Sequence, residues 1–260
     1  MTTLLAIDIG NTNVTLGLFD YADGHGKLAQ HWRIGTHRDQ TSDEVSVVLR
    51  SLFDQAGRRT DEITDGIVSS VVPPLLPIWE RMCSKLFERA PMVVGPGIRT
   101  GMPVRYENPR EVGADRIVNA VAAYERWPQG AIVVDFGTAT TFDVVTARGE
   151  YAGGVIAPGL TASAEALYHA TAKLPRVEIA RPAVVVGRNT VASMQAGLVF
   201  GYAGLVDAIV DRIRGEVDFS PRVVGTGGLA PLIARETRTI DECDDRLTLQ
   251  GLAIIHDRNR

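Results

Sequence analysis

The sequence of 260 residues has little cysteine, few aromatic side chains and no excess of basic residues. Its two cysteines, Cys83 and Cys243, lack the spacing of metal ligands, and so low a content favours a reducing compartment. The five histidines show no ligand spacing either. Lys and Arg number 27 against 31 Asp and Glu, and the net charge of −4 gives no reason to expect a nucleic acid or an anionic membrane as a partner.

Long apolar runs are also missing. No stretch reaches the ~18 residues of a membrane-spanning helix, and no basic segment precedes the first apolar run, as it would in a signal peptide. With 45% hydrophobic and 22% charged residues, the composition is that of an ordinary globular protein. We therefore expect a cytoplasmic protein with enough chain for two modest α/β domains.

What the sequence does contain is a strand, a tight turn and a second strand at its start. Residues 4–7 and 14–19 are apolar runs typical of strands, and residues 10–13 (Gly-Asn-Thr-Asn) have turn chemistry. Asp8 stands where the first strand ends, and a carboxylate there needs water, hydrogen bonds or a cation. The segment fits a phosphate-binding hairpin with Asp8 facing a metal ion, and it equally fits an ordinary hairpin with an Asx-turn.

Alternating apolar patterns and turn residues predict further elements along the chain. In the first half we predict strands at 32–34, 66–72 and 92–94, helices at 42–55 and 75–89, and a polar loop or turn over 20–31. In the second half we predict two strands within 131–145, separated by a turn at Gly137, further strands at 151–156 and 222–224, and helices at 113–127, 161–171, 191–214, from 229 and at 249–256. Glycines within 191–214 permit the close approach of another helix, which we interpret as packing or a subunit interface.

The opening pattern returns 127 residues later. In residues 131–145, Asp135 and Gly137 stand in the positions of Asp8 and Gly10, again between an apolar strand and small polar residues. Because this offset is close to half the chain, it indicates two homologous domains, each led by the same hairpin. We predict domains at 1–112 and 113–260, with the final helix, about 247–260, packing back on the first domain.

Three strand ends therefore carry glycine with threonine, at 8–13, 135–140 and 225–228. We expect the first two hairpins to clamp a polyphosphate between the domains. The third precedes a helix N-terminus and suits the adenosine or α-phosphate side, although a plain strand-to-helix turn explains it equally when it is taken alone. Together, at the domain spacing, the three motifs predict nucleotide binding.

In these motifs the chain resembles the type III pantothenate kinases, which belong to the acetate and sugar kinase/Hsp70/actin superfamily. The matching segments are Asp8-Ile-Gly-Asn-Thr-Asn, Gly113-Ala-Asp-Arg, Asp135-Phe-Gly-Thr-Ala-Thr-Thr, Gly153-Gly-Val-Ile-Ala-Pro-Gly-Leu, Asn189-Thr190 and Gly225-Thr-Gly-Gly. The resemblance implies an α/β fold of two duplicated actin-like (ribonuclease H-like) domains, with mixed sheets flanked by helices. It also implies ATP-dependent phosphorylation of the primary hydroxyl of pantothenate, the first step of coenzyme A synthesis.

The resemblance further implies a role for each matching residue. Asp115 is expected to be the general base, Asp135 to bind a monovalent cation (K⁺ or NH₄⁺), and Thr138 to contact ATP. The residues expected to hold the ATP phosphates are Asp8, Ile9, Gly10, Asn11, Thr12, Asn13, Val14 and Thr15, with Asp8 also facing Mg²⁺ directly or through water. The residues expected to contact pantothenate are Tyr106, Gly113, Ala114, Asp115, Arg116 and Thr190. Thr190 is expected to come from the partner subunit of a homodimer whose active site lies at the interface.

Elementary chemistry supports these expectations and also leaves alternatives. Phosphoryl transfer depends mainly on positioning and charge neutralisation, and a hydroxyl acceptor needs a carboxylate to take its proton. Asp115 can serve as that base, or it can merely cap a helix. Arg116 can bind a carboxylate with its two-pronged guanidinium, or it can pair on the surface. Likewise, Asp135 can be held by turn N–H groups alone, and Thr190 can be only an N-cap.

Two other functions are compatible with the same motifs. One is a kinase that phosphorylates another small hydroxylated acid, and the other is a non-catalytic accessory regulator that keeps the nucleotide-binding fold. Against the regulator, the proposed carboxylates Asp8, Asp115 and Asp135 are all present, and no basic helix offers a DNA footprint.

Overall fold

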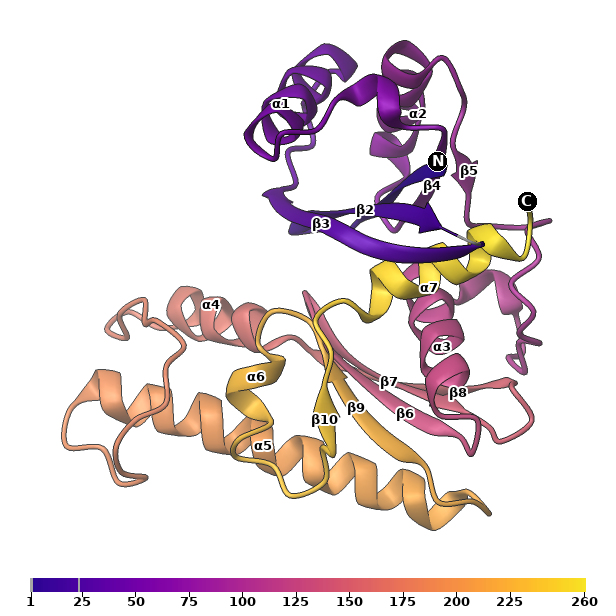
Figure 1. Ribbon diagram of the computed structural model, residues 1–260. Coiled ribbons are helices and arrows are strands. Elements are labelled where there is room, and N and C mark those ends of the chain that lie inside the picture. Colours follow the sequence, from indigo (N-terminus) through magenta and orange to yellow (C-terminus); the bar gives the residue numbers. More distant parts are fainter. Residues whose placement is uncertain (1, 23) are drawn as a thin grey trace. The chain divides into compact units, whose positions relative to one another are not determined.

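The computed structural model describes residues 2–22 and 24–260 and divides the chain into two compact units (Figure 1). Unit 1 contains Met1–Gly101, Asn108–Ala122 and Thr248–Arg260, and unit 2 contains Met102–Glu107 and Ala123–Leu247. Helix α3 (Ala114–Arg126) begins in unit 1 and ends in unit 2. The domain boundary that we place after residue 112 stays a prediction.

Unit 1 is built on a mixed five-stranded sheet in the order β3-β2-β1-β4-β5. Three antiparallel strands, β1 (Thr2–Ile9), β2 (Asn13–Ala22) and β3 (His25–Gly35), are joined by two parallel strands, β4 (Asp65–Ser70) and β5 (Met92–Val93). The loop predicted over residues 20–31 is wrong, because β2 and β3 pair along their whole length. The polar sequence misled the prediction since β3 is an edge strand, and its side chains from residue 26 to 31 lie mostly in solvent.

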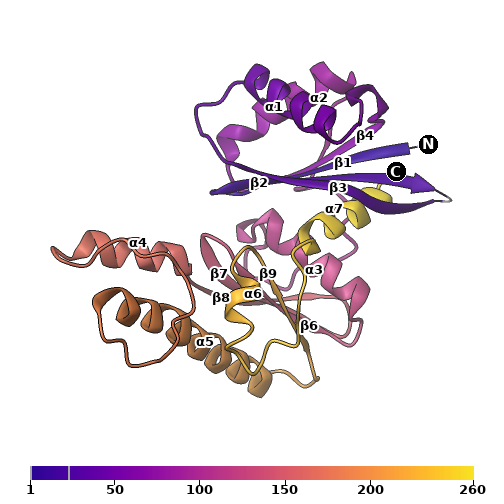
Figure 2. The ribbon, with the colours of Figure 1, turned by 60° about the vertical axis from the view of Figure 1, so that its left-hand side comes forward.

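The helices of unit 1 cover both faces of this sheet. Helices α1 (Ser42–Gln55) and α2 (Leu76–Phe87) pack on one face through a cluster that includes Phe53 and Trp79 (Figure 2). Helix α7 (Leu247–Asp257) lies on the other face (Figure 1), where Gly17 of β2 leaves room for a leucine of α7. Short 3-10 helices complete the unit at Thr60–Glu62, Pro73–Leu75 and Pro109–Glu111.

Unit 2 repeats the architecture with the strand order β8-β7-β6-β9-β10. The strands are β6 (Ala131–Phe136), β7 (Ala139–Val145), β8 (Tyr151–Pro158), β9 (Arg222–Thr226) and β10 (Glu242–Cys243), with β6-β7-β8 antiparallel and β6-β9-β10 parallel. Helices α4 (Leu160–Ala170), α5 (Thr190–Glu216) and α6 (Ala230–Ile233) contribute to one hydrophobic core with this sheet. Each unit is therefore a three-stranded meander followed by two parallel strands, which confirms the predicted duplicated α/β fold.

Helix α5 has 27 residues and, by length and composition only, is apolar enough to cross a membrane. It also provides much of the core of unit 2, with buried residues such as Val199, Val206 and Val210. A buried core helix meets the same criterion of length and composition as a spanning helix, so this feature is weak support for a membrane segment. Its three central glycines, at 197, 201 and 204, have nothing within 4 Å of the position of an added Cβ.

Candidate active site

The turn between β1 and β2 is held tightly from within and from outside. The N–H of Gly10 donates to the carbonyl oxygen of Asn13 at 3.0 Å, and an added Cβ at Gly10 would lie only 2.9 Å from that oxygen. From outside, the hydroxyl of Thr36 donates to the carbonyl of Gly10 at 2.7 Å, and its N–H donates to the carbonyl of Thr12 at 3.0 Å. The side chains of Asn11 and Thr12 are exposed to solvent.

Asp8 lies at the end of the central strand β1, between Thr15 of β2 and Ser69 of β4. Ser69 is fully buried, and its hydroxyl donates to Oδ1 of Asp8 at 2.5 Å. Burial raises the pKa of Asp8 to about 7, the Ser69 hydrogen bond opposes this rise, and the charge of Asp115 adds to it. Asp8 is therefore a carboxyl whose ionised form needs a nearby cation.

Asp115 occupies the first turn of α3, directly after a glycine that makes room for it. An added Cβ at Gly113 would lie 2.5 Å from Oδ1 of Asp115, so only glycine fits there without a shift. That same oxygen accepts the N–H of Arg116 at 2.8 Å. Burial raises the pKa of Asp115, while the hydrogen bond from Arg116 and the charge of Arg116 work against the rise. Because α3 begins at Ala114, Asp115 lies inside the helix rather than at the preceding cap position.

Asp8 and Asp115 thus form a pair of electrostatically interacting carboxyls in unit 1, and burial raises both pKa values. Among the residues that the structure describes, no group of three or more His, Cys, Asp and Glu side chains could hold a metal ion. Mg²⁺ is commonly bound by one or two carboxylates together with phosphates and water rather than by a full protein cage. Asp8 therefore fits a magnesium ion that arrives with a nucleotide, with the carboxyl of Asp115 near enough to interact with it electrostatically.

Arg116 is buried, with 8% of its surface exposed, in the helical turn that also carries Asp115. This burial argues against the alternative of a surface ion pair. A buried guanidinium offers a planar two-pronged donor that suits a carboxylate.

In unit 2, Asp135 ends β6 as Asp8 ends β1. It lies between Thr141 of β7 and Thr226 of β9. Gly227 follows with a φ of +88°, and an added Cβ there would lie 2.7 Å from Oδ1 of Asp135 and 2.8 Å from the carbonyl oxygen of Phe136. These two oxygen atoms lie so close to Gly227 that only glycine fits there without a shift. Oxygen ligands of this kind suit a hard cation.

The remaining residues of the sequence motifs lie at separate places in unit 2. Thr138 is exposed in the β6–β7 turn, where its carbonyl packs against the backbone of Gly159. Tyr106 lies beside Tyr151 of β8, with ring centroids 6.4 Å apart. Thr190 is the exposed first residue of α5, and the cap is Asn189, whose side chain accepts the N–H of Ala192 at 2.8 Å. Capping therefore does not require the Thr190 hydroxyl.

Sequence reasoning missed Ser69. The strand pairing puts it opposite Asp8, a relation that local patterns do not contain. The signal that could have found it is a pair of serines, at 69 and 70, that directly follows the buried apolar residues Ile67 and Val68.

Comparisons with known proteins agree with the motifs. A family model described as type III pantothenate kinase matches residues 4–212. A type III pantothenate kinase from Anaeromyxobacter sp. (strain K) is 58% identical over 257 residues, which cover 99% of this chain and 100% of that protein.

Two solved structures share the fold at low sequence identity. One is a Baf family transcriptional activator from Campylobacter jejuni, with a TM-score of 0.60, 18% identity and 98% of each chain covered. The other is a ROK family glucokinase from Streptomyces griseus in complex with glucose and AMPPNP, with a TM-score of 0.52 and 12% identity, covering 96% of this chain and 98% of that one. At these identities the likeness concerns the fold alone.

Proposed function

The chain belongs to the type III pantothenate kinase family, and from this premise we propose that Asp115 is the general base for transfer of a phosphoryl group from ATP to the primary hydroxyl of pantothenate. The activity is that of a kinase in coenzyme A synthesis. The assignment of the base depends on one observation. Asp8 and Asp115 interact electrostatically, and burial raises the pKa of each carboxyl.

The surroundings of Asp115 suit a base. A carboxylate that is too acidic removes a proton poorly, and burial brings its pKa nearer to the working pH. The N–H of Arg116 holds one carboxylate oxygen, which fixes the side chain and leaves the second oxygen for the substrate hydroxyl. Gly113, which has no Cβ, leaves room for the carboxylate in this position.

Pantothenate binding is assigned to the segment around this base and to Tyr106 and Thr190. We expect Thr190 to come from the partner subunit. Arg116 would bind the pantothenate carboxylate through its planar fork, with Gly113 and Ala114 forming the adjoining backbone. Tyr106 would offer an aromatic face, because it is half-buried against Tyr151.

ATP binding is assigned to the turn from Asp8 to Thr15 and to Thr138. In the first turn, the exposed side chains of Asn11 and Thr12 would donate to phosphate oxygens. Mg²⁺, when bound with the nucleotide, neutralises phosphate charge, and Asp8 would hold it. The hydrogen bond from Ser69 would keep the Asp8 carboxylate in place for this task.

A monovalent cation is assigned to Asp135. Support comes from the carboxylate oxygen of Asp135 and the carbonyl oxygen of Phe136, which both lie close to Gly227. We expect K⁺ and NH₄⁺ to raise turnover and Na⁺ to have little effect. Equal turnover in all three salts would remove this role from Asp135.

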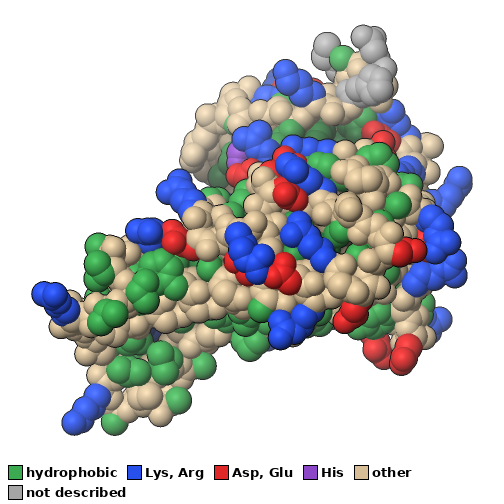
Figure 3. Space-filling view, turned by 90° about the horizontal axis from the view of Figure 1, so that it is seen from below, with side chains coloured by type: hydrophobic (Ala, Val, Ile, Leu, Met, Phe, Trp, Pro, Cys, Tyr) green, Lys and Arg blue, Asp and Glu red, His purple; other side chains and the backbone are tan. Residues whose placement is uncertain are grey.

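The proposal includes a homodimer in which Thr190 contributes to the substrate site of the partner subunit. It also includes a cytoplasmic location. Support for the dimer comes from exposed apolar side chains near Thr190, at Val184, Val185, Val186 and Val191. Figure 3 shows hydrophobic side chains gathered at one end of the face that carries α5. Exposed apolar patches of this kind commonly mark protein interfaces.

The test of the base is Asp115→Asn, assayed by coupled ADP release with pantothenate, ATP, Mg²⁺ and K⁺. We expect kcat to fall by about 10²–10⁴-fold, while the affinity for ATP and the melting temperature change little. The matched control is Asp54→Asn, which alters an exposed carboxylate on α1. Turnover of Asp115→Asn near the wild-type rate would overturn the assignment of the base.

A further inference from the structure

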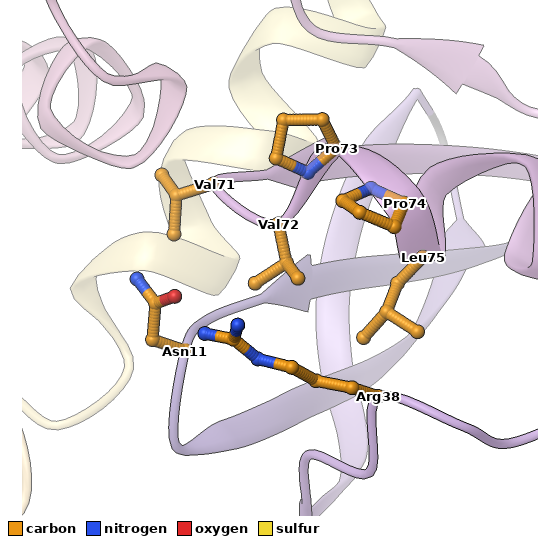
Figure 4. A pocket seen from close by; sticks show the side chains of 7 residues that line it. All are labelled: Asn11, Arg38, Val71, Val72, Pro73, Pro74 and Leu75. Atoms are coloured by element: carbon orange, nitrogen blue, oxygen red, sulfur yellow. The ribbon is translucent and has the colours of Figure 1, made fainter.

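The loop between β3 and α1 brings an arginine to the phosphate turn. Its residue Arg38 lines a small cavity together with Asn11 and residues 71–75. Figure 4 shows the Arg38 side chain extending along the cavity, with its guanidinium directed toward Asn11. The cavity has a volume of about 140 Å³.

This loop is fixed at both ends. At its start, Thr36 makes the two hydrogen bonds that tie it to the phosphate turn, through Gly10 and Thr12. At its end, Thr41 caps α1 in a reciprocal pair with Glu44. Arg38 therefore sits on a short span that is held at its start to the phosphate turn and at its end to α1.

The charge of Arg38 is not neutralised within the described part of the chain. Arg38 is exposed and makes no hydrogen bond or ion pair there, even with the adjacent Asp39. Arg58 of the same unit is different, since it pairs with Asp20 at 2.7 Å and with Glu62 at 2.8 Å. An arginine beside a phosphate turn with no anionic partner suits a ligand that supplies the anion.

The walls of the cavity narrow the choice of ligand. Val71, Val72 and Leu75 are apolar, and Pro73 and Pro74 have no N–H to donate, so Arg38 and Asn11 are the polar side chains of the lining. The volume corresponds to roughly four to five water molecules in the liquid, which is room for a phosphate group and not for a nucleoside.

The position of the cavity indicates which phosphate it takes. Val71 lines the cavity and also lies beside Gly113, since an added Cβ at that glycine would be 3.6 Å from Cγ1 of Val71. Gly113 in turn adjoins Asp115. The cavity is therefore next to the segment that carries the proposed base, where the phosphate to be transferred must lie.

We propose that Arg38 binds the terminal phosphate of ATP through its guanidinium, with Asn11 on the opposite side of that phosphate. The proposal rests on the proposed function, in which the turn from Asp8 to Thr15 holds the ATP phosphates. It adds a residue that no sequence motif of the chain contains, and it names the phosphate as the group recognised. Binding alone is involved, and no bond is made or broken by Arg38.

The test measures the dissociation constants of AMP, ADP and ATP with Mg²⁺ by calorimetry for the wild type, Arg38→Gln, Arg38→Lys and Arg50→Gln. Arg50 is a matched control, because it is an exposed arginine on α1 with no ion pair in the described residues. A hydrogen bond between charged groups predicts that Arg38→Gln weakens ATP binding by about tenfold to a hundredfold. For Arg38→Gln, AMP binding, the melting temperature and the KM for pantothenate should stay near the wild-type values. The dissociation constant of Arg38→Lys for ATP should lie between those of the wild type and Arg38→Gln.

Each contrary result has a distinct meaning. Unchanged ATP binding by Arg38→Gln, an equal loss for all three nucleotides, or a change confined to the KM for pantothenate would overturn the assignment of Arg38. Failure of the wild type itself to bind ATP would instead overturn the proposed nucleotide site, and the Arg38 proposal would fall with it.

Discussion

Replacing Asp8 by asparagine is expected to stabilise the ligand-free protein at pH 8 more than at pH 5. The pKa of Asp8 is about 7 in the fold and 3.8 in an unperturbed aspartate. Between these values the folded protein keeps a proton that the unfolded chain has lost, so the stability contributed by this residue falls as the pH rises. Above pH 7 the fold must hold a charge that burial disfavours, and asparagine removes this charge.

The size of the effect follows from the same two pKa values. The full difference corresponds to at most about 4 kcal/mol well above pH 7, of which about 2.5 kcal/mol develops between pH 5 and pH 8. Asp8 is only half-buried, and water access lowers the figure, so we expect the gain of Asp8→Asn to be about 2 kcal/mol larger at pH 8 than at pH 5. The hydroxyl of Ser69 can still donate to the amide oxygen of asparagine, so packing should change little.

The assay is urea unfolding of the wild type and Asp8→Asn at both pH values, without nucleotide or Mg²⁺. Asp54→Asn is the control for loss of an exposed carboxylate, and its effect should be small and nearly the same at both pH values. Asp115 is present in all three proteins, and because its charge raises the pKa of Asp8, the pH dependence that Asp8→Asn removes includes the interaction between the two carboxyls. If Asp8→Asn changes stability equally at pH 5 and pH 8, the carboxyl does not titrate as the structure indicates.

Three further changes test other parts of the site. Ser69→Ala removes the hydrogen bond that lowers the pKa of Asp8, so the pH at which Mg²⁺ and ATP begin to bind should shift upward in calorimetric titrations. Gly227→Ala forces a left-handed backbone on alanine and places its Cβ against Asp135, so thermal melting should show a loss of about 1–3 kcal/mol and activation by K⁺ should weaken. Val185→Asp, at a side chain that is 66% exposed, should leave the fold intact and lower the apparent mass in sedimentation if this surface is the dimer interface.

Much of the fold could be predicted from the repeat of Asp8 and Gly10 at Asp135 and Gly137. The repeat is local information, because a strand, a carboxylate and a glycine turn follow one another within a few residues. The long β2–β3 hairpin was missed because β3 is an edge strand whose side chains from residue 26 to 31 lie mostly in solvent, so burial imposes no apolar pattern on them.

The site was predictable where a motif is continuous and not where it depends on register. Asp115 and its flanking residues stand in one continuous segment, so the sequence could predict all of them as site residues. Ser69 and Arg38 come near the turn only through strand pairing and through the two hydrogen bonds of Thr36, which no local pattern encodes. The inclusion of residues 108–122 in unit 1 is likewise a matter of long-range packing.

The position of Asp8 on β1 determines how fast the backbone around it exchanges amide protons with solvent. β1 pairs along its length with β2 on one side and β4 on the other, so its amide protons should exchange with solvent only in rare openings of the sheet. The turn that follows is held by a few hydrogen bonds and should exchange much sooner. A nucleotide that binds both would slow exchange mainly in the turn. Asp8 is thus held in place by the sheet, and the turn beside it is the part of the site that changes conformation when a ligand binds.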